Sequence, residues 1–259
     1  MKLKIFQVDA FTSKVFGGNP AAVIPLENWL DDKILQNIGL ENNLSETAFF
    51  VKEKEGYRIR WFTPTSEVDL CGHATLASSF VLFNILNKKE NVIKFNSRSG
   101  ELLVEKNDDL ISLNFPARNP QKIETPENLL ATLTERPSEI LFDKSIICVF
   151  ENEDIVRNLK PKVKDFLNVN THGVIITAPG ENVDFVSRFF APDVGIDEDP
   201  VTGYAHTLLI PYWAKRLAKD KLHALQVSQR GGELFCENLN GRVKISGNAV
   251  LYLEGEITI

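Results

Sequence analysis

The fold of this chain is decided by Arg60-Trp61-Phe62-Thr63-Pro64, a stretch that leads into Leu70-Cys71-Gly72-His73-Ala74-Thr75-Leu76. A related stretch, Arg188-Phe189-Phe190-Ala191-Pro192, leads into Val201-Thr202-Gly203-Tyr204-Ala205-His206-Thr207-Leu208 in the second half. Each copy reads as a strand, an acidic loop and a tight glycine turn that opens an apolar helix. An internal repeat of this kind sets the architecture of a protein. Two copies are too few for a solenoid, so they predict two related lobes with a site between them.

The helix expected after the first glycine turn covers residues 74–86 and is apolar on nearly every face. A helix that is apolar all round is buried, and the strands predicted immediately after it can wrap around it. The second helix is expected over residues 205–218, where Pro211 predicts a kink or a break. The sequence therefore predicts an α/β (α+β) fold with two similar lobes, each a mixed β-barrel wrapped around a central buried helix.

The segment 116–126 contains three prolines and few apolar residues, which makes it the best candidate linker. We place the N-terminal lobe at residues 1–116, with Glu46 and the first glycine-turn helix. The C-terminal lobe then covers residues 117–259, with Asp199 and the second glycine-turn helix. The last strand can also return to the first lobe, and the local sequence does not decide between the two.

Composition excludes several classes of function. The formal charge of −6 offers no basic surface to neutralise phosphates, so we expect no nucleic-acid partner. The start of the chain lacks the apolar core of a signal peptide, and the longest apolar run is too short to span a bilayer. We therefore expect a cytoplasmic protein with no membrane partner. The three cysteines match neither a disulfide framework nor a metal-ligand pattern, so no metal site is expected.

The two glycine turns, at Gly72 and Gly203, are candidate anion sites. A helix that starts at a glycine presents free backbone N–H groups and the positive end of the helix dipole, which suit a carboxylate. A glycine before a helix is also common as a purely structural feature. Repetition in matched contexts favours the functional interpretation here.

Three further side chains could carry chemistry. Glu46 lies at the mouth of a very apolar strand and is either a solvated edge charge or a general acid/base, because apolar neighbours favour the neutral acid. Asp199 precedes the second helix and is either a stabilising N-terminal acid or a substrate ligand. His73, in the first turn of the first helix, is either structural or a donor to a substrate oxygen.

Cys71 needs separate consideration, because a thiolate at a helix N-terminus has a lowered pKa and could act as a base. The matched position holds Thr202, which cannot take a proton at neutral pH. We therefore interpret Cys71 as a small buried residue. None of the glycine pairs forms a dinucleotide or phosphate-loop motif, so no nucleotide cofactor is implied.

Five motifs spread over nearly the whole chain resemble the PhzF-like (phenazine biosynthesis-like) family. They are Phe6-Gln7-Val8-Asp9-Ala10-Phe11, Gly18-Asn19-Pro20-Ala21-Ala22-Val23, Leu44-Ser45-Glu46-Thr47-Ala48-Phe49, Leu70-Cys71-Gly72-His73-Ala74-Thr75-Leu76 and Glu198-Asp199-Pro200-Val201-Thr202-Gly203. The resemblance implies the diaminopimelate-epimerase-like fold, with the site between two β-barrel lobes. It also implies a cytoplasmic enzyme without a cofactor, often a homodimer.

The characterised phenazine enzyme isomerises a dihydro-hydroxyanthranilate. By resemblance, Glu46 matches its proton-shuttling carboxylate, while Gly72, His73 and Asp199 match positions that contact the substrate. This chain departs from the family at Tyr204, where many relatives carry a small serine. A tyrosine there would reshape the site, which puts the phenazine substrate in question.

We therefore expect an isomerase, independent of cofactors, that moves a proton within a small, carboxylate-bearing metabolite, with Glu46 as the general acid/base. Two alternatives stay open: a racemase or epimerase on the same fold, which needs two bases, and a catalytically silent small-molecule-binding protein. The resemblance is also compatible with a homodimer. The expected substrate-binding residues are Asn19, Gly72, His73, Asp199, Gly203 and Tyr204.

Overall fold

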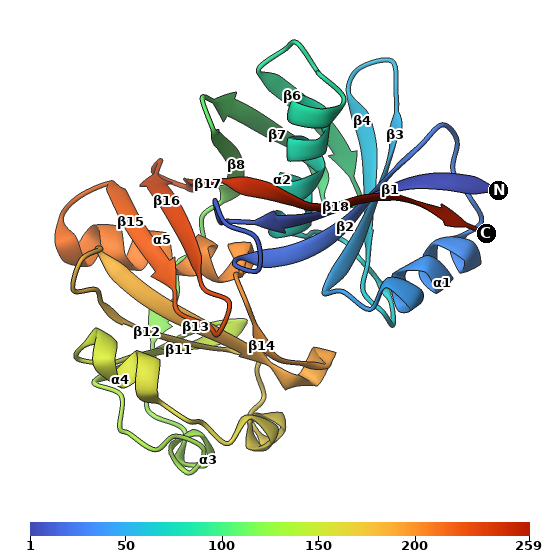
Figure 1. Cartoon of the computed structure of the whole chain (residues 1–259). Coiled ribbons are helices and arrows are strands. Elements are labelled where there is room, and N and C mark those ends of the chain that lie inside the picture. The colour runs from blue at the N-terminus through green and yellow to red at the C-terminus, as the bar shows by residue number, and fades with distance from the viewer. The chain divides into compact units, whose positions relative to one another are not determined.

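The computed structural model describes residues 1–259 and divides the chain into two compact units (Figure 1). The first unit comprises Met1–Phe115 and Lys244–Ile259, and the second comprises Pro116–Val243. None of the helices is long and apolar enough to cross a membrane.

The first unit is a mixed sheet with a long outer helix and a buried inner helix. Its strands β1 and β2 are antiparallel, β2 is parallel to β3, and β4 is antiparallel to β3. The C-terminal strand β18 pairs antiparallel with β1 along its whole length. The elements are β1 (Lys2–Ala10), β2 (Asn19–Leu26), α1 (Asp32–Asn42), β3 (Glu46–Lys52), β4 (Tyr57–Phe62), β5 (Glu67–Val68), α2 (Gly72–Phe80), the π-helical turn η1 (Val81–Ile85), β6 (Val92–Ser97), β7 (Gly100–Asn107), β8 (Leu110–Pro116) and β18 (Ala249–Thr258).

The second unit repeats this order with shorter outer helices. Between β11 and β12 the chain forms α4 and a 3₁₀ segment, with Pro161 between them. The elements are β9 (Gln121–Lys122), α3 (Glu127–Leu130), β10 (Glu139–Asp143), β11 (Ser145–Val149), α4 (Glu153–Asn158), η2 (Val163–Asn168), β12 (Val174–Pro179), β13 (Phe185–Ala191), η3 (Pro192–Val194), β14 (Ile196–Asp199), α5 (Gly203–Leu217), β15 (Lys221–Gln226), β16 (Gly232–Asn238) and β17 (Arg242–Gly247), the last of which crosses the boundary between the units.

The two units share one strand-pairing scheme. In the first, β4 is antiparallel to β5 and parallel to β6; in the second, β13 is antiparallel to β14 and parallel to β15. The parallel pair β2 and β3 likewise has its counterpart in β11 and β12. This repetition confirms the two similar α/β lobes that the sequence predicted.

Each unit has an apolar core under its outer helix. In the first, Leu35 and Ile38 of α1 pack with Phe49 and Phe62 of the sheet. In the second, Val156 of α4 packs with the corresponding face of β12 and β13. Because side chains alternate along a strand, the residues between these core positions point to the opposite face of each sheet.

The inner helices are buried, and two hydroxyls of α2 are satisfied within the helix itself. In α2, the hydroxyls of Ser78 and Ser79 donate to backbone carbonyls four residues earlier, at 2.8 Å each. Of the kink or break expected at Pro211, the break is absent, because α5 continues through it to Leu217. Pro211 cannot donate to the carbonyl of Thr207, and the backbone N–H of Arg118 donates to that carbonyl instead, at 3.0 Å. The freed carbonyl is thus satisfied.

Candidate functional site

Glu46 is the first residue of β3 and faces the inner helix. It shares its face of the sheet with Ala48, and with Trp61 on β4 opposite Ala48. Helix α2 begins beside this face, which brings Nε2 of His73 to 3.1 Å from Oε2 of Glu46. That oxygen is buried but is not aligned for a hydrogen bond with any donor. The first unit therefore holds a buried carboxylate oxygen close to a histidine, with its hydrogen-bonding capacity unused.

The other ring nitrogen of His73 has two neighbours. Nδ2 of Asn19, at the start of β2, lies 3.2 Å from Nδ1, and Sγ of Cys71 lies 3.5 Å from the same atom. Asn19 is fully buried, so its side chain lies against His73 at a position where the sequence predicted a substrate contact. The fold thus brings Asn19, Glu46 and Cys71, from three separate segments, around the imidazole of His73.

The charges in this cluster determine its protonation. Burial raises the pKa of the Cys71 thiol to about 11, with a further contribution from the charge of Glu46. Burial alone would lower the pKa of His73, but negative charge on Cys71 and Glu46 outweighs it and holds that pKa well above its usual value. Since Cys71 is a neutral thiol near pH 7, Glu46 supplies the charge that acts on the ring there. The charge of Glu46 therefore favours the protonated form of the His73 ring.

The same three side chains raise the question of a metal, because ligand atoms of Glu46, Cys71 and His73 lie within 4.8 Å of one another. Local sequence patterns do not reveal this cluster, since Glu46 is far from the other two along the chain. Cys71 lies 3.5 Å from Nδ1 and 4.0 Å from Nε2, and Glu46 lies beside Nε2. Nε2 of His73 is therefore the nitrogen that could share an ion with the other two side chains.

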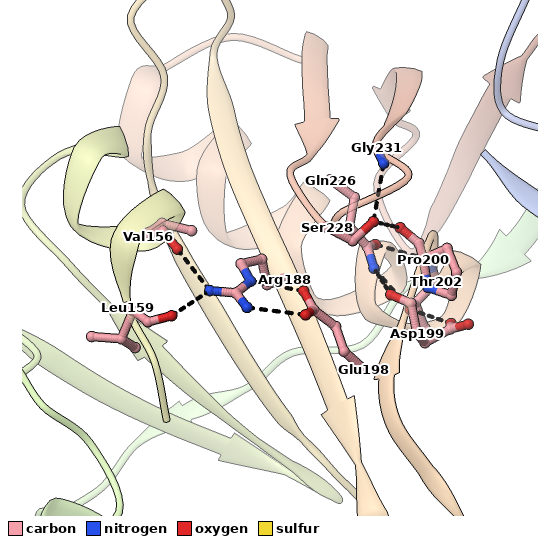
Figure 2. Close-up of polar contacts among 10 residues, drawn as sticks. All are labelled: Val156, Leu159, Arg188, Glu198, Asp199, Pro200, Thr202, Gln226, Ser228 and Gly231. Carbon is pink, nitrogen blue, oxygen red and sulfur yellow. Dashed lines mark hydrogen bonds and ion pairs between the residues drawn. The ribbon is translucent and has the colours of Figure 1, made fainter. Parts of the chain in front are cut away.

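In the second unit, Asp199 ends β14 and is held in a polar network (Figure 2). The hydroxyl of Thr202 donates to Oδ2 of Asp199. The buried side chain of Gln226, on β15, bonds both residues: Oε1 accepts the backbone N–H of Thr202 at 2.9 Å, and Nε2 donates to the backbone carbonyl of Asp199 at 2.7 Å. Sequence reasoning missed Gln226, because nothing in the local sequence links it to a residue 27 positions earlier.

Tyr204, the second residue of α5, is half-buried within the second unit. Its hydroxyl accepts a hydrogen bond from Oγ of Ser145 at 3.2 Å. Its ring makes edge contacts with Phe189 and His172, and the guanidinium of Arg118 lies 5.7 Å from its centroid. Burial raises the pKa of Tyr204, so its phenol is neutral. Tyr204 is therefore held by specific partners, none of which the sequence indicated.

Both glycine-turn helices begin in the same way. Gly72 and Gly203 are the first residues of α2 and α5, as the sequence predicted. In each unit, the carbonyl of the residue before the glycine accepts a hydrogen bond from a side chain of the first helical turn. Oγ1 of Thr75 donates to the Cys71 carbonyl in the first unit, and Nδ1 of His206 donates to the Thr202 carbonyl, at 2.8 Å, in the second. These bonds fix each turn, and the backbone N–H groups at the helix start are left to face outward along the axis.

Strand register aligns the two clusters position by position. Thr47 faces Phe62 and Val174 faces Phe190, so Gly173 occupies the position that Glu46 has in the first unit. By the same alignment Asp199 corresponds to Val68, and Tyr204 to His73. The carboxylate–imidazole pair is thus present in one unit only, while Asp199 is present only in the other.

Comparisons with known proteins identify the class to which this two-lobed chain belongs. The family model described as "Phenazine biosynthesis-like protein" matches residues 8–255, and the chain belongs to this family. An uncharacterized isomerase from Pseudomonas aeruginosa is 49% identical over 257 residues, which cover 99% of both chains. A crystal structure of a phenazine biosynthesis protein of the PhzF family from Enterococcus faecalis is 47% identical, with a TM-score of 0.98 and complete coverage of both chains.

A more distant structure shows the fold alone. It is that of a predicted epimerase from Pseudomonas aeruginosa, with 17% identity, a TM-score of 0.75 and 99% coverage of both chains. The expected family and the diaminopimelate-epimerase-like fold class are therefore confirmed, and the relatives identify the chain as an isomerase.

Proposed function

We propose that this chain is an isomerase, independent of cofactors, in which Glu46 moves a proton within a small, carboxylate-bearing metabolite. The observation that supports this most is the state of Glu46. Its Oε2 is buried, lies 3.1 Å from His73 and has no aligned hydrogen-bond donor. A carboxylate and an imidazole buried together at this distance are groups that can take up and release a proton, and such pairs are found at active sites.

The chemistry follows from the neighbours of Glu46. The imidazole of His73 lies 3.1 Å from the carboxylate, where it can hold Glu46 in position while that group accepts and returns a proton. Glu46 would take a proton from an activated carbon of the substrate and return it to another carbon on the same face. The helix starts at Gly72 and Gly203 would stabilise the negative charge that develops, and Asp199 would bind a polar or ammonium group.

The internal comparison favours an isomerase over a racemase. A racemase needs bases on two faces of its substrate, and the position equivalent to Glu46 is Gly173, which has no side chain. Asp199 does not replace it, because it corresponds to Val68 and not to Glu46. One carboxylate that serves as base and then as acid accounts for the chemistry with fewer groups. A cytoplasmic location and homodimeric assembly belong to this proposal and rest on family resemblance.

A screen of small carboxylic acids in heavy water tests the proposal, because an isomerase of this kind exchanges a substrate proton with solvent. We expect one compound or a few to gain deuterium only when the enzyme is present. Glu46→Gln should fold normally and still bind that compound, but lose about a hundredfold to ten-thousandfold of the exchange rate, as is typical for loss of a general base.

Asp199→Asn serves as the comparison variant. It should weaken binding of the compound more than it slows exchange at saturating concentration. Full exchange by Glu46→Gln would show that the carboxylate is structural, and the proposed mechanism would then be abandoned.

A further inference from the structure

Both polar atoms of the buried Gln226 side chain form hydrogen bonds with the segment that carries Asp199. Gln226 is 1% exposed, and both of its polar atoms bond residues of the turn that precedes α5. We propose that Gln226 is a positioning residue that orients the Asp199 carboxylate through the hydroxyl of Thr202. This inference rests on the substrate-binding part of the proposed function, and adds to it the group that fixes the geometry of the carboxylate.

The direction of each hydrogen bond follows from the donors available. Nε2 of Gln226 has two hydrogens, which go to the backbone carbonyl of Asp199, at 2.7 Å, and to Oγ1 of Thr202, at 3.2 Å. Oγ1 thus already accepts a hydrogen, and its own single hydrogen goes to Oδ2 of Asp199. The chain of donors therefore runs from Gln226 to Thr202 to Asp199 in one direction only. A buried chain in which every donor is committed holds its last acceptor in a single orientation.

The first unit provides a natural comparison. Parallel pairing of β4 with β6 and of β13 with β15 aligns Ser97 with Gln226. Ser97 bonds only within its own hairpin, where its hydroxyl donates to the carbonyl of Gly100 at 2.8 Å. At the aligned positions, Val68 and Cys71 replace Asp199 and Thr202. The carboxylate, hydroxyl and amide thus occur together in one unit and are all absent from the other, as expected if they act together.

The backbone around Asp199 is fixed independently of this chain (Figure 2). On one side, Nε and Nη2 of Arg188 donate to the carboxylate of Glu198 at 2.7 and 3.0 Å. On the other, Oγ of Ser228 donates to the carbonyl of Pro200 at 2.8 Å, and the N–H of Gly231 donates to that same Oγ at 3.1 Å. Since these contacts hold the backbone together with the two bonds that Gln226 makes to it, the bond from Gln226 to Thr202 and on to Oδ2 adds the orientation of the Asp199 side chain.

Crystal structures of two variants test the proposal without any substrate. Gln226→Glu keeps the size of the side chain and can still accept the N–H of Thr202, but it cannot donate to Oγ1 or to the Asp199 carbonyl. The Thr202 hydroxyl then has two carboxylates to choose between. We expect the Asp199 carboxylate to adopt a different rotamer in Gln226→Glu and also in Thr202→Val, which removes the hydroxyl and keeps the shape.

Thr207→Val is the matched control. It removes a nearby threonine hydroxyl, in α5, that donates to the backbone carbonyl of Tyr204 and not to Asp199. It should leave Asp199 in its original rotamer. In addition, nuclear magnetic resonance of Thr202→Val should show a changed shift for one of the two Gln226 amide protons and not for the other. A general loss of packing would move both.

The proposal is overturned if Asp199 keeps its rotamer in Gln226→Glu, or if Thr207→Val moves it equally. If Gln226→Glu does not fold, Thr202→Val decides alone by the same criterion. With a substrate from the heavy-water screen, Gln226→Glu should raise KM about tenfold to a hundredfold with a smaller effect on kcat, because it disturbs a hydrogen bond to a charged group. Unchanged Asp199 geometry would refute this inference and leave the role of Glu46 intact.

Discussion

At the scale of single residues, His73 and His206 show how neighbours set the state of a buried imidazole. Both are buried near the start of an inner helix. His73 lies beside a carboxylate, which favours its charged form. The ring of His206 lies 5.9 Å from that of Phe185, and burial lowers the pKa of His206 to about 4 despite the bond to the Thr202 carbonyl. The first histidine is thus suited to charge chemistry and the second to a structural role.

The lowered pKa of His206 predicts a loss of stability on acidification. The unfolded chain takes up a proton on this histidine near pH 6.5, whereas the folded chain does so only near pH 4. Between these values the unfolded state binds more protons, so stability falls as pH falls. The full contribution is roughly 3 kcal/mol at an ordinary value of 1.36 kcal/mol per pKa unit.

Urea unfolding of the wild type and of His206→Gln at several pH values measures this effect. The destabilisation caused by the substitution should shrink as the pH is lowered from 7 to 4, because only the wild type loses stability through this group. Thr207→Val, in the same helix but without a titratable group, should show a destabilisation independent of pH. A constant difference between wild type and His206→Gln would contradict the prediction.

At the scale of elements, each unit has one arginine whose guanidinium bonds both carboxylate oxygens of a glutamate. This bidentate pair, called the fork below, connects a strand to the acidic segment that follows it. Nε and Nη2 of Arg60 donate to the two carboxylate oxygens of Glu67, and Arg188 bonds Glu198 through the same two atoms. The third nitrogen differs. In Arg60, Nη1 donates to exposed Asp32, whereas in Arg188 it donates to the carbonyls of Val156 and Leu159, at the end of α4. The second fork therefore also fastens the outer helix.

This difference predicts unequal effects of the same substitution. Arg188→Lys should cost about 2–3 kcal/mol, because lysine cannot reproduce the fork and leaves buried carbonyls unpaired. Arg60→Lys should cost about 1 kcal/mol, since Glu67 keeps Arg98 at 2.7 Å and an exposed partner such as Asp32 contributes little. Urea denaturation of both variants checks the order. Equal costs would show that the contacts to α4 add nothing.

The two arginines illustrate what the sequence could and could not predict. The repetition of these arginines and the glycine turns at Gly72 and Gly203 could be predicted, because a repeated local sequence pattern encodes repeated local structure. Their pairing with Glu67 and Glu198 depends on how each loop folds back, which periodicity does not record. For the same reason the contact of Asn19 with His73, and the bonds of Gln226, could not be predicted. The continuation of α5 through Pro211 could not be predicted either, because the carbonyl that Pro211 leaves without its helical donor is satisfied by a distant group, the N–H of Arg118.

At the scale of the whole molecule, one pairing scheme carries two different sets of side chains. The repetition of strands is close enough to align single positions, yet only the first unit has a carboxylate at the start of the strand that faces its inner helix. The second unit has Gly173 there and a carboxylate at another position, Asp199. Related architecture has therefore been kept while the chemistry has become specific to each unit.

The second unit is also built so that no side chain fits at residue 173. A Cβ added to Gly173 would lie 2.6 Å from the ring of Phe189 and 3.0 Å from the carbonyl oxygen of Phe190. We predict that Gly173→Ala destabilises the protein by about 1–3 kcal/mol, the usual cost of overpacking. Phe189→Leu removes the ring and should recover about half of that loss in the double variant, which a double-mutant cycle in urea would measure.

Gly255→Ala is the control for this last prediction, because a Cβ at that strand position would meet nothing closer than 3.7 Å and should change stability little. A stable Gly173→Ala would show that the second unit has room for a side chain where the first has Glu46. A second carboxylate could then be accommodated by simple substitution, and the two-base alternative would regain its force. If the clash is confirmed, the packing of Phe189 itself excludes a second carboxylate at this position, which would support the one-base proton transfer proposed above.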